Sequence, residues 1–273
     1  MDRLRQVQVG ALRVSFVPDG AVKMVPRFLF PGTSETDWAD NARFLDDAGR
    51  LTISSGALLV EHGDRAVLID AGYGPYPEPV SRMEYGIAEM YGGALLDNLR
   101  RLGREPRDIE AIAITHLHIE HVGWAAHPAF AHAPCLLSDT EWSGRAATPG
   151  VSEQVLTAIG QRFRPVSAAE PILPGVTALA LPGHTPGQTG YLLTSGDARL
   201  LAFADVMHSA VQVSHPDWPL LGESSPEESA AVRRQVLRRL ADERAIGFGI
   251  HFADVTFGTV RQTGDAFSWE PLP

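Results

Sequence analysis

Cysteine and long apolar runs are both scarce in this sequence, and each shortage excludes a class of protein. Cys135 is the single cysteine among 273 residues, so a disulfide within the chain cannot form. It lies in the apolar stretch 134–137, which favours a small buried side chain over a nucleophile. No apolar run approaches the roughly 20 residues of a membrane-spanning helix, so a membrane protein is not expected.

Positive charge is also in short supply. The chain has 23 Lys and Arg against 33 Asp and Glu, a formal net charge of −10. Because nucleic-acid binding relies on clustered Lys and Arg, nucleic acid is not an expected partner. Residues 1–6 are charged and lack the apolar core of a signal peptide. Together with the single cysteine, this start predicts a cytoplasmic protein.

Histidine, in contrast, is concentrated in the stretch 114–124. Within six residues it places three histidines and a carboxylate: His116, His118, Glu120 and His121. They follow an apolar run, 112–114, that predicts a buried strand. Neutral imidazole is the commonest metal ligand, and strand alternation would point His116 and His118 to the same side. The alternative is a polar loop that is rich in histidine by coincidence, and the density argues against it. The stretch therefore predicts a metal site.

Three more predicted strands end in a residue that can bind a metal. These residues are His184, Asp205 and His251. A lone histidine after a strand is more often a hydrogen-bonded surface residue, but strand ends are also where rigid sheets carry functional side chains. Taken with the histidine cluster, they favour one shared site. Asp70 also ends a predicted strand, where it either supports a metal-bound histidine or caps the following turn.

The order of predicted elements suggests two sheets packed face to face with helices outside. The strands are predicted at 7–17 (a hairpin), 51–53, 57–61, 66–70, 112–114, 135–137, 176–181, 189–193, 200–203 and 245–250, and the helices at 94–102, 152–163 and 226–240. We expect the sheets to divide the chain near residue 125. Segments 18–50 and 73–93 are rich in aromatic residues, Gly and Pro, and we interpret them as insertions. Without a linker-like break, residues 1–273 are expected to form a single domain.

With these residues in this order, the sequence resembles the metallo-β-lactamase-fold hydrolases. Their signature is His-Xaa-His-Xaa-Asp-His, then Gly-His-Thr-Xaa-Gly, an Asp and a late His. The resemblance spans residues 57–251 and implies an α+β fold, a four-layer αββα sandwich with a metal site at one edge. It assigns His116, His118 and His184 to one zinc ion and Glu120, His121 and His251 to a second, with Asp205 bridging. One or two zinc ions are expected, with iron or manganese as alternatives.

One position departs from the family pattern. Glu120 stands where the family has Asp, and its carboxylate reaches about 1 Å further. The second ion is then shifted, weakened, exchanged for another metal or lost, or the substitution is without consequence. The sequence leaves these outcomes open.

The resemblance implies hydrolysis of an ester-type bond by a metal-bound hydroxide. Residues 204–208 and the aromatic insertions resemble the lactonase and methyl-parathion-hydrolase branch, so a lactone is the first candidate substrate. Glu120 would orient the nucleophile, and His208 would stabilise the oxyanion or protonate the leaving group. Alternatives are a thioesterase, a polyketide cyclase, a phosphotriesterase, or a non-catalytic metal- or ligand-binding protein with a degenerate second site.

The insertions supply candidate walls for a small-molecule pocket. The predicted substrate-binding residues are Phe28, Phe30, Tyr85, Met90, Tyr91 and Trp218. Their apolar side chains suit an acyl chain or an aromatic group. A homodimer interface is the rival use of the same aromatic residues.

Overall fold

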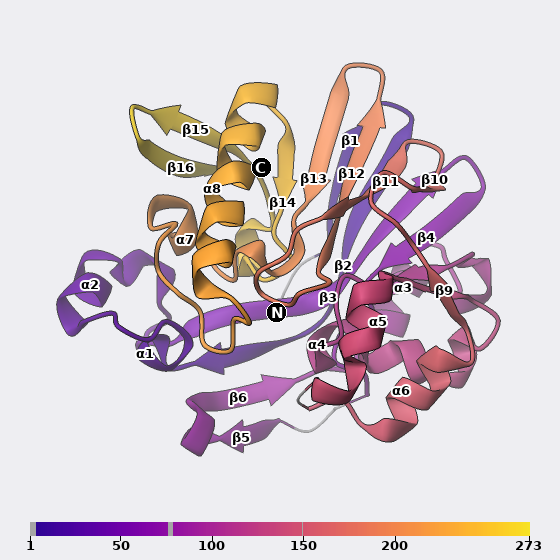
Figure 1. Cartoon of the computed structure of the whole chain (residues 1–273), viewed down its shortest axis with the longest axis horizontal. Helices are drawn as coiled ribbons and strands as arrows, with labels where there is room; N and C mark the ends of the chain where they lie inside the picture. Colours follow the sequence, from indigo (N-terminus) through magenta and orange to yellow (C-terminus); the bar gives the residue numbers. More distant parts are fainter. Residues whose placement is uncertain (1–3, 76–78, 149) are drawn as a thin grey trace.

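The computed structural model describes residues 4–75, 79–148 and 150–273, whose strands form two sheets (Figure 1). The first sheet has the order β5-β6-β2-β3-β4-β7-β8-β9, with β1 paired to β2, and the second runs from β10 to β16 in sequence order. The strands of the first sheet are β1 (Arg5–Val9), β2 (Leu12–Met24), β3 (Leu51–His62), β4 (Arg65–Ile69), β5 (Val80–Arg82), β6 (Ile87–Tyr91), β7 (Ile112–Ala113), β8 (Cys135–Leu137) and β9 (Phe163–Pro165). The second sheet contains β10 (Pro171–Leu173), β11 (Val176–Ala180), β12 (Thr189–Ser195), β13 (Ala198–Ala202), β14 (Ile246–Phe248), β15 (Phe257–Thr263) and β16 (Ala266–Pro271).

Helices cover the outer faces of both sheets. They are α1 (Pro26–Leu29), α2 (Glu35–Asp40), α3 (Leu95–Arg101), α4 (Ile119–Val122), α5 (Asp139–Gly144), α6 (Glu153–Gly160), α7 (Val211–Ser214) and α8 (Pro226–Glu243), with short 3-10 turns between them. Figure 1 shows α8 beside the second sheet and α3, α5 and α6 grouped on the other side of the molecule. Within the part of the chain that the structure describes, no helix is long and apolar enough to cross a membrane.

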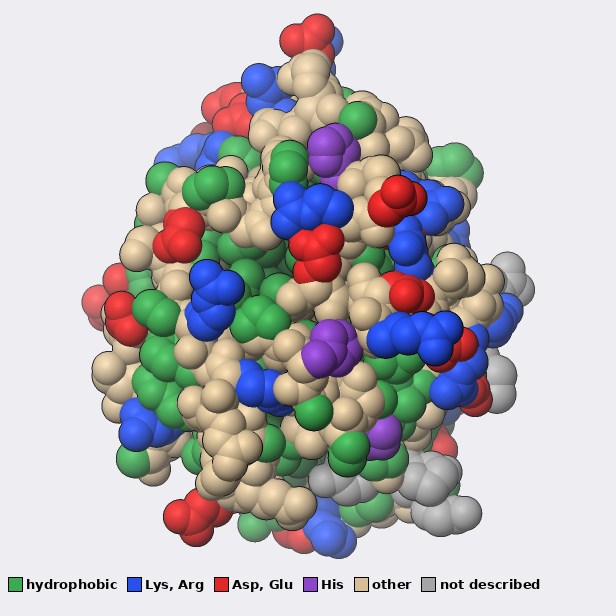
Figure 2. Space-filling model, turned by 90° about the vertical axis from the view of Figure 1, so that its right-hand side faces the viewer, with side chains coloured by type: hydrophobic (Ala, Val, Ile, Leu, Met, Phe, Trp, Pro, Cys, Tyr) green, Lys and Arg blue, Asp and Glu red, His purple; other side chains and the backbone are tan. Residues whose placement is uncertain are grey.

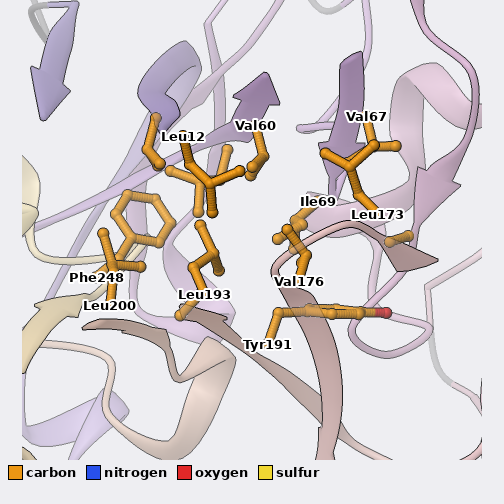
Figure 3. Close-up of a cluster of buried hydrophobic side chains, with 14 of the residues drawn as sticks. Leu12, Val60, Val67, Ile69, Leu173, Val176, Tyr191, Leu193, Leu200 and Phe248 are labelled. Atoms are coloured by element: carbon orange, nitrogen blue, oxygen red, sulfur yellow. The ribbon is translucent and has the colours of Figure 1, made fainter. Parts of the chain in front are cut away.

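Successive side chains of a strand point to opposite faces of its sheet and so enter different layers of the core. In β4, Val67 and Ile69 join the core between the sheets, whereas Ala66 and Leu68 join the core beneath α3 and α6. Side chains of the second sheet, such as Tyr191 and Leu193, meet the first group from the opposite side (Figure 3). On the outer face of the second sheet, α8 packs through Leu237 and its neighbours. The predicted αββα layering is confirmed.

The division between the sheets was predicted in the wrong place. β7, β8 and β9 extend the first sheet in parallel from β4, so the second sheet begins only at β10 and not near residue 125. These strands are two or three residues long, too short to show a periodicity in the sequence.

Two segments expected to be irregular contain regular strands. β2 continues to Met24 because a bulge between Pro18 and Gly20 absorbs the proline, which has no N–H to donate. Within 73–93, β5 and β6 form a hairpin that extends the edge beside β2, while residues 76–78 lie outside the described residues. The hairpin of β15 and β16, which follows the late histidine, was not predicted at all.

Candidate metal centre

Strand direction brings the predicted ligands to one edge of the sandwich. β4 and β7 are parallel, and so are β13 and β14, so the loops after them leave at the same end of their sheets. β11 is antiparallel to β12, which is antiparallel to β13, so β11 shares the direction of β13. These loops carry the ligands His116 to His121, His184, Asp205 and His251.

His116 and His118 lie beyond the strand that was expected to hold them. β7 ends at Ala113, and His118 occupies the N-cap position of α4. The prediction that strand alternation orients His116 and His118 was therefore wrong, because both residues lie in the irregular turn between β7 and α4. The two rings nevertheless meet, with His116 Nε2 lying 3.0 Å from His118 Nδ1.

Four donor atoms form the first cluster: His116 Nε2, His118 Nδ1, His184 Nε2 and Asp205 Oδ2. His184 Nε2 lies 3.0 Å from His118 Nδ1. Asp205 Oδ2 lies 3.5 Å from the Nε2 atoms of His116 and His184. A zinc ion with Zn–N bonds of about 2.0–2.1 Å separates neighbouring tetrahedral ligand atoms by about 3.3–3.4 Å. The spacing of these donors therefore suits a tetrahedral ion.

The second cluster contains Glu120, His121, Asp205 and His251, with their ligand atoms within 4.8 Å of one another. Asp205 Oδ1 lies 3.2 Å from His121 Nε2 and 3.1 Å from His251 Nε2. Asp205 thus belongs to both clusters: Oδ2 lies beside His116 and His184 and Oδ1 beside His121, while His251 Nε2 is also 3.2 Å from Oδ2. This is the arrangement expected of a carboxylate that bridges two ions.

Partners outside the clusters fix which nitrogen of each histidine carries a proton. His251 Nδ1 lies 2.7 Å from the carbonyl oxygen of Ser54, which can only accept. His121 Nδ1 lies 2.8 Å from a carboxylate oxygen of Asp70. Both partners favour a proton on Nδ1, which leaves Nε2 of each ring directed toward the centre as the atom that would bind an ion. Without an ion, burial opposes the charged form of both rings, but Asp205 outweighs it and raises the pKa of each. His116 is supported in a similar way by Thr115 Oγ1, 3.0 Å from its Nδ1.

The electrostatics of the buried cluster also suit a cation. Burial lowers the pKa of His116 and His184 well below the ordinary value, so both rings are neutral. Burial opposes ionisation of Asp205, but the surrounding histidines, His121 first among them, hold its pKa well below the ordinary range. Among the described residues, His121 Nε2 and Asp205 Oδ1 are buried without a hydrogen-bond partner. A metal ion would satisfy both atoms.

Glu120 and His208 complete the site. Burial opposes the charged form of Glu120, but His118 and His121 outweigh it and lower the pKa of Glu120. His208 Nε2 lies 2.9 Å from Asp205 Oδ2, and its backbone N–H donates to Gln212 Oε1 at 2.7 Å. Burial lowers the pKa of His208 despite the neighbouring carboxylate. Sequence reasoning missed Gln212 and Ser54, since neither lies in a motif.

The six predicted pocket residues do not come together in one wall. Phe30 is fully buried and packs against Trp218, with ring centroids 6.1 Å apart, and Met90 joins the same apolar cluster. Phe28 and Tyr85 are instead 44% and 63% exposed, and Tyr91 lies at the end of β6. Phe30 thus lies in an apolar core, and its contact with a substrate stays a prediction.

Cavities lie on either side of the clusters. One of about 300 Å³ is bordered by His118, His184 and Glu141. Another, of about 500 Å³, is bordered by His251, Phe44 and Trp269. None of the six predicted pocket residues lines either cavity. Cavities of this size match small-molecule sites.

Comparison with known proteins gives several relatives. The chain is 29% identical over 100 residues to an N-acyl homoserine lactonase of a Bacillus species, covering 36% of this chain and 38% of that protein. It is 27% identical over 117 residues to an N-acyl homoserine lactonase of Bacillus thuringiensis, covering 42% and 45%. These matches span less than half the length of the lactonases.

Solved structures share the fold over nearly the whole chain. AidC, a dizinc quorum-quenching lactonase in complex with a product, has a TM-score of 0.83 at 23% identity, covering 100% of this chain and 98% of AidC. The hydrolase AbOPH has a TM-score of 0.84 at 22% identity, with the same coverage of 100% and 98%. At this identity the likeness shows a common fold.

A family model described as the metallo-beta-lactamase superfamily matches residues 53–247. The match includes strands of both sheets, β4 to β13 in full, and all predicted metal ligands except His251. This chain belongs to the metallo-beta-lactamase superfamily.

Proposed function

We propose that this protein is a metal-dependent hydrolase of ester-type bonds, with a lactone as the first substrate to test. The observation that carries the proposal is Asp205, whose carboxylate belongs to both clusters of ligands, with Oδ2 beside His116 and Oδ1 beside His121. The lactonase relatives support the choice of substrate. The imidazole and carboxylate donors favour zinc, and iron or manganese also accept such donors.

The residues of the two clusters have distinct roles in this proposal. When bound, a pair of ions supplies an activated water and polarises the carbonyl oxygen of the substrate. Asp205 holds the two sites in register, and Glu120 orients the attacking water. His208 lies against Asp205 and has its own Nδ1 buried without a partner among the described residues. It would hydrogen-bond the developing oxyanion or protonate the leaving alkoxide.

The charge of the chain does not favour a nucleic-acid substrate. Figure 2 shows a face on which basic and acidic side chains are interspersed among apolar ones rather than gathered into a basic stripe. The net charge of −10 adds repulsion from phosphate. A small uncharged or weakly charged ester suits this protein better.

A substrate panel tests the proposal. Zinc-loaded protein is assayed with an N-acyl homoserine lactone, an aryl lactone, a thioester, an aryl ester and a phosphotriester. We expect lactone hydrolysis to be fastest, and His116→Ala and His184→Ala to abolish both hydrolysis and ion binding. Faster turnover of the thioester or phosphotriester would replace the lactone assignment. Retention of zinc by both histidine variants would refute the metal centre.

A further inference from the structure

Glu141, in the first turn of α5, is a buried carboxylate that touches two loops of the first cluster. Its side chain is 5% exposed. Oε1 accepts a hydrogen bond from the backbone N–H of Leu117 at 2.9 Å, and Leu117 stands between His116 and His118. Oε2 accepts from Thr185 Oγ1 at 2.7 Å and from the backbone N–H of Gly187 at 3.1 Å. One carboxylate therefore connects the loop of His116 and His118 to the loop of His184.

The start of α5 fits closely against the second of these loops. Ser138 caps the helix by accepting from the N–H of Glu141, and its hydroxyl donates to the carbonyl of Gly187 at 2.7 Å. A Cβ atom at Gly187 would lie 2.2 Å from the backbone nitrogen of Glu141, so only glycine permits this approach. The helix and the loop are thus held at a fixed distance.

A cavity lies on the side of the first cluster that faces Glu141, so packed side chains do not hold the loops together there. The cavity of about 300 Å³ is bordered by His118, His184 and Glu141 together. On that side the two ligand rings have empty space beside them rather than packed side chains. The contacts to Glu141 therefore constrain the distance between the loops, together with the backbone hydrogen bond from the Thr189 N–H to the Thr115 carbonyl at 2.9 Å.

We propose that Glu141 is a positioning residue that sets the spacing of His116, His118 and His184 and thereby the affinity of the first cluster for its ion. It makes no hydrogen bond to a ligand atom and acts through the backbone of the two loops. The inference rests on the proposed metal centre. Residues that orient metal ligands through hydrogen bonds typically change metal affinity 10- to 100-fold when they are replaced.

The test compares Glu141→Gln with Glu61→Gln in a His251→Ala background, chosen to isolate the ion of the first cluster. Glu61 is a matched control, because it is also a buried carboxylate but pairs with Arg13 and Arg104. Zinc affinity is measured by competition with a chromophoric chelator, and the ligand field by cobalt absorption. We expect Glu141→Gln to weaken zinc binding about 10-fold or more and to alter the cobalt spectrum. Glu61→Gln should leave both readouts unchanged.

Equal affinity in Glu141→Gln and its parent would overturn the proposal, and so would an equal loss in Glu61→Gln. If Glu141→Gln does not fold, Thr185→Val removes one donor and keeps the carboxylate. A smaller but measurable loss of affinity is then expected, and unchanged affinity counts against the proposal. A parent that binds no zinc would instead refute the metal centre itself, which separates the two failures.

Discussion

Asp70 and His121 are joined by a contact of 2.8 Å between a carboxylate oxygen and Nδ1. Asp70 has a φ of 63°, the left-handed region that a residue other than glycine seldom adopts. Its carboxylate also accepts from the N–H and hydroxyl of Thr115. Such backbone strain costs about 1–3 kcal/mol and is tolerated where the surrounding contacts hold the residue in place. Of the two roles considered for Asp70, the structure shows the support of a histidine; the carboxylate also holds Thr115, after β7, rather than the turn that follows Asp70.

Asp70→Asn should weaken the second ion more than the first. The amide cannot accept the Nδ1 proton of His121 as strongly, so Nε2 becomes a poorer and less well oriented ligand. We expect a 10- to 100-fold lower affinity for the second ion, measured by zinc titration monitored by calorimetry. Asp97→Asn, on the exposed side of α3, is the control. Equal loss at both sites would show a general loss of structure instead.

Removal of metal should destabilise the folded chain. An ion present at 100 times its Kd stabilises the folded state by about 3 kcal/mol, which corresponds to roughly 5–10 °C in a protein of this size. Thermal unfolding with and without a chelator measures the difference. Zinc added back should restore the midpoint. A midpoint that does not respond to chelator would contradict ion binding by the wild-type clusters.

Glu120→Asp tests the position at which this chain departs from its family. The shorter side chain withdraws the carboxylate by about 1 Å, the difference of one methylene group. The ligand atoms of Glu120, His121, Asp205 and His251 lie within 4.8 Å of one another with glutamate in place. With aspartate, we expect the second ion to bind about 10-fold more weakly and the first to be unaffected. Ion counting by mass spectrometry after dialysis provides the measurement. Equal content in both forms would show that either carboxylate serves.

His208→Gln should lower the rate of hydrolysis while ions stay bound. Loss of a proton donor or oxyanion partner reduces kcat by about 10²–10⁴-fold, with KM changing little. His215→Gln is a useful comparison, because His215 stacks on Trp218 and is absent from both clusters. Steady-state kinetics on the best substrate of the panel give the result. A His208 variant with normal kcat would remove this residue from the mechanism.

Acid should weaken the fold through Glu61. Burial alone would raise the pKa of Glu61, but hydrogen bonds from Arg13 and Arg104 outweigh it and hold the pKa below 4.5. A lowered pKa contributes stability above the unfolded value, and the contribution disappears as pH falls through the folded value. Glu61→Gln should therefore cost about 2 kcal/mol near neutral pH and progressively less below about pH 4.5. Urea unfolding across this range tests it, and a constant difference would exclude the pair as the cause.

The sequence predicted the chemistry of the centre better than its surroundings. His116, His184 and Asp205 could be recognised because metal binding demands particular side chains at strand ends, and those demands leave a pattern. The role of Phe30 was harder to predict, because an aromatic residue gives the same sequence signal in a core and in a pocket. Glu141 was not recognised, because two of its three partners are backbone groups at Leu117 and Gly187, which have no signature of their own.

The location of the sheet boundary shows a further limit. β7, β8 and β9 take their place in the first sheet through long-range parallel pairing, and nothing within two or three residues encodes such a partner. In contrast, β4 was predicted to within one residue and β3 as two strands, 51–53 and 57–61, since the apolar residues and the Gly-containing turn between them lie within one local window.

The position of Asp205 between ligands from both sheets determines when the centre can form during folding. His116, His118 and His121 follow strands of the first sheet, whereas His184, Asp205 and His251 follow strands of the second. The two groups can meet only after the sheets have docked, and contacts so distant in sequence form slowly. Capture of an ion by the complete centre therefore marks the end of folding rather than its beginning. During refolding, the appearance of the bound-cobalt spectrum would time the closure of the sandwich.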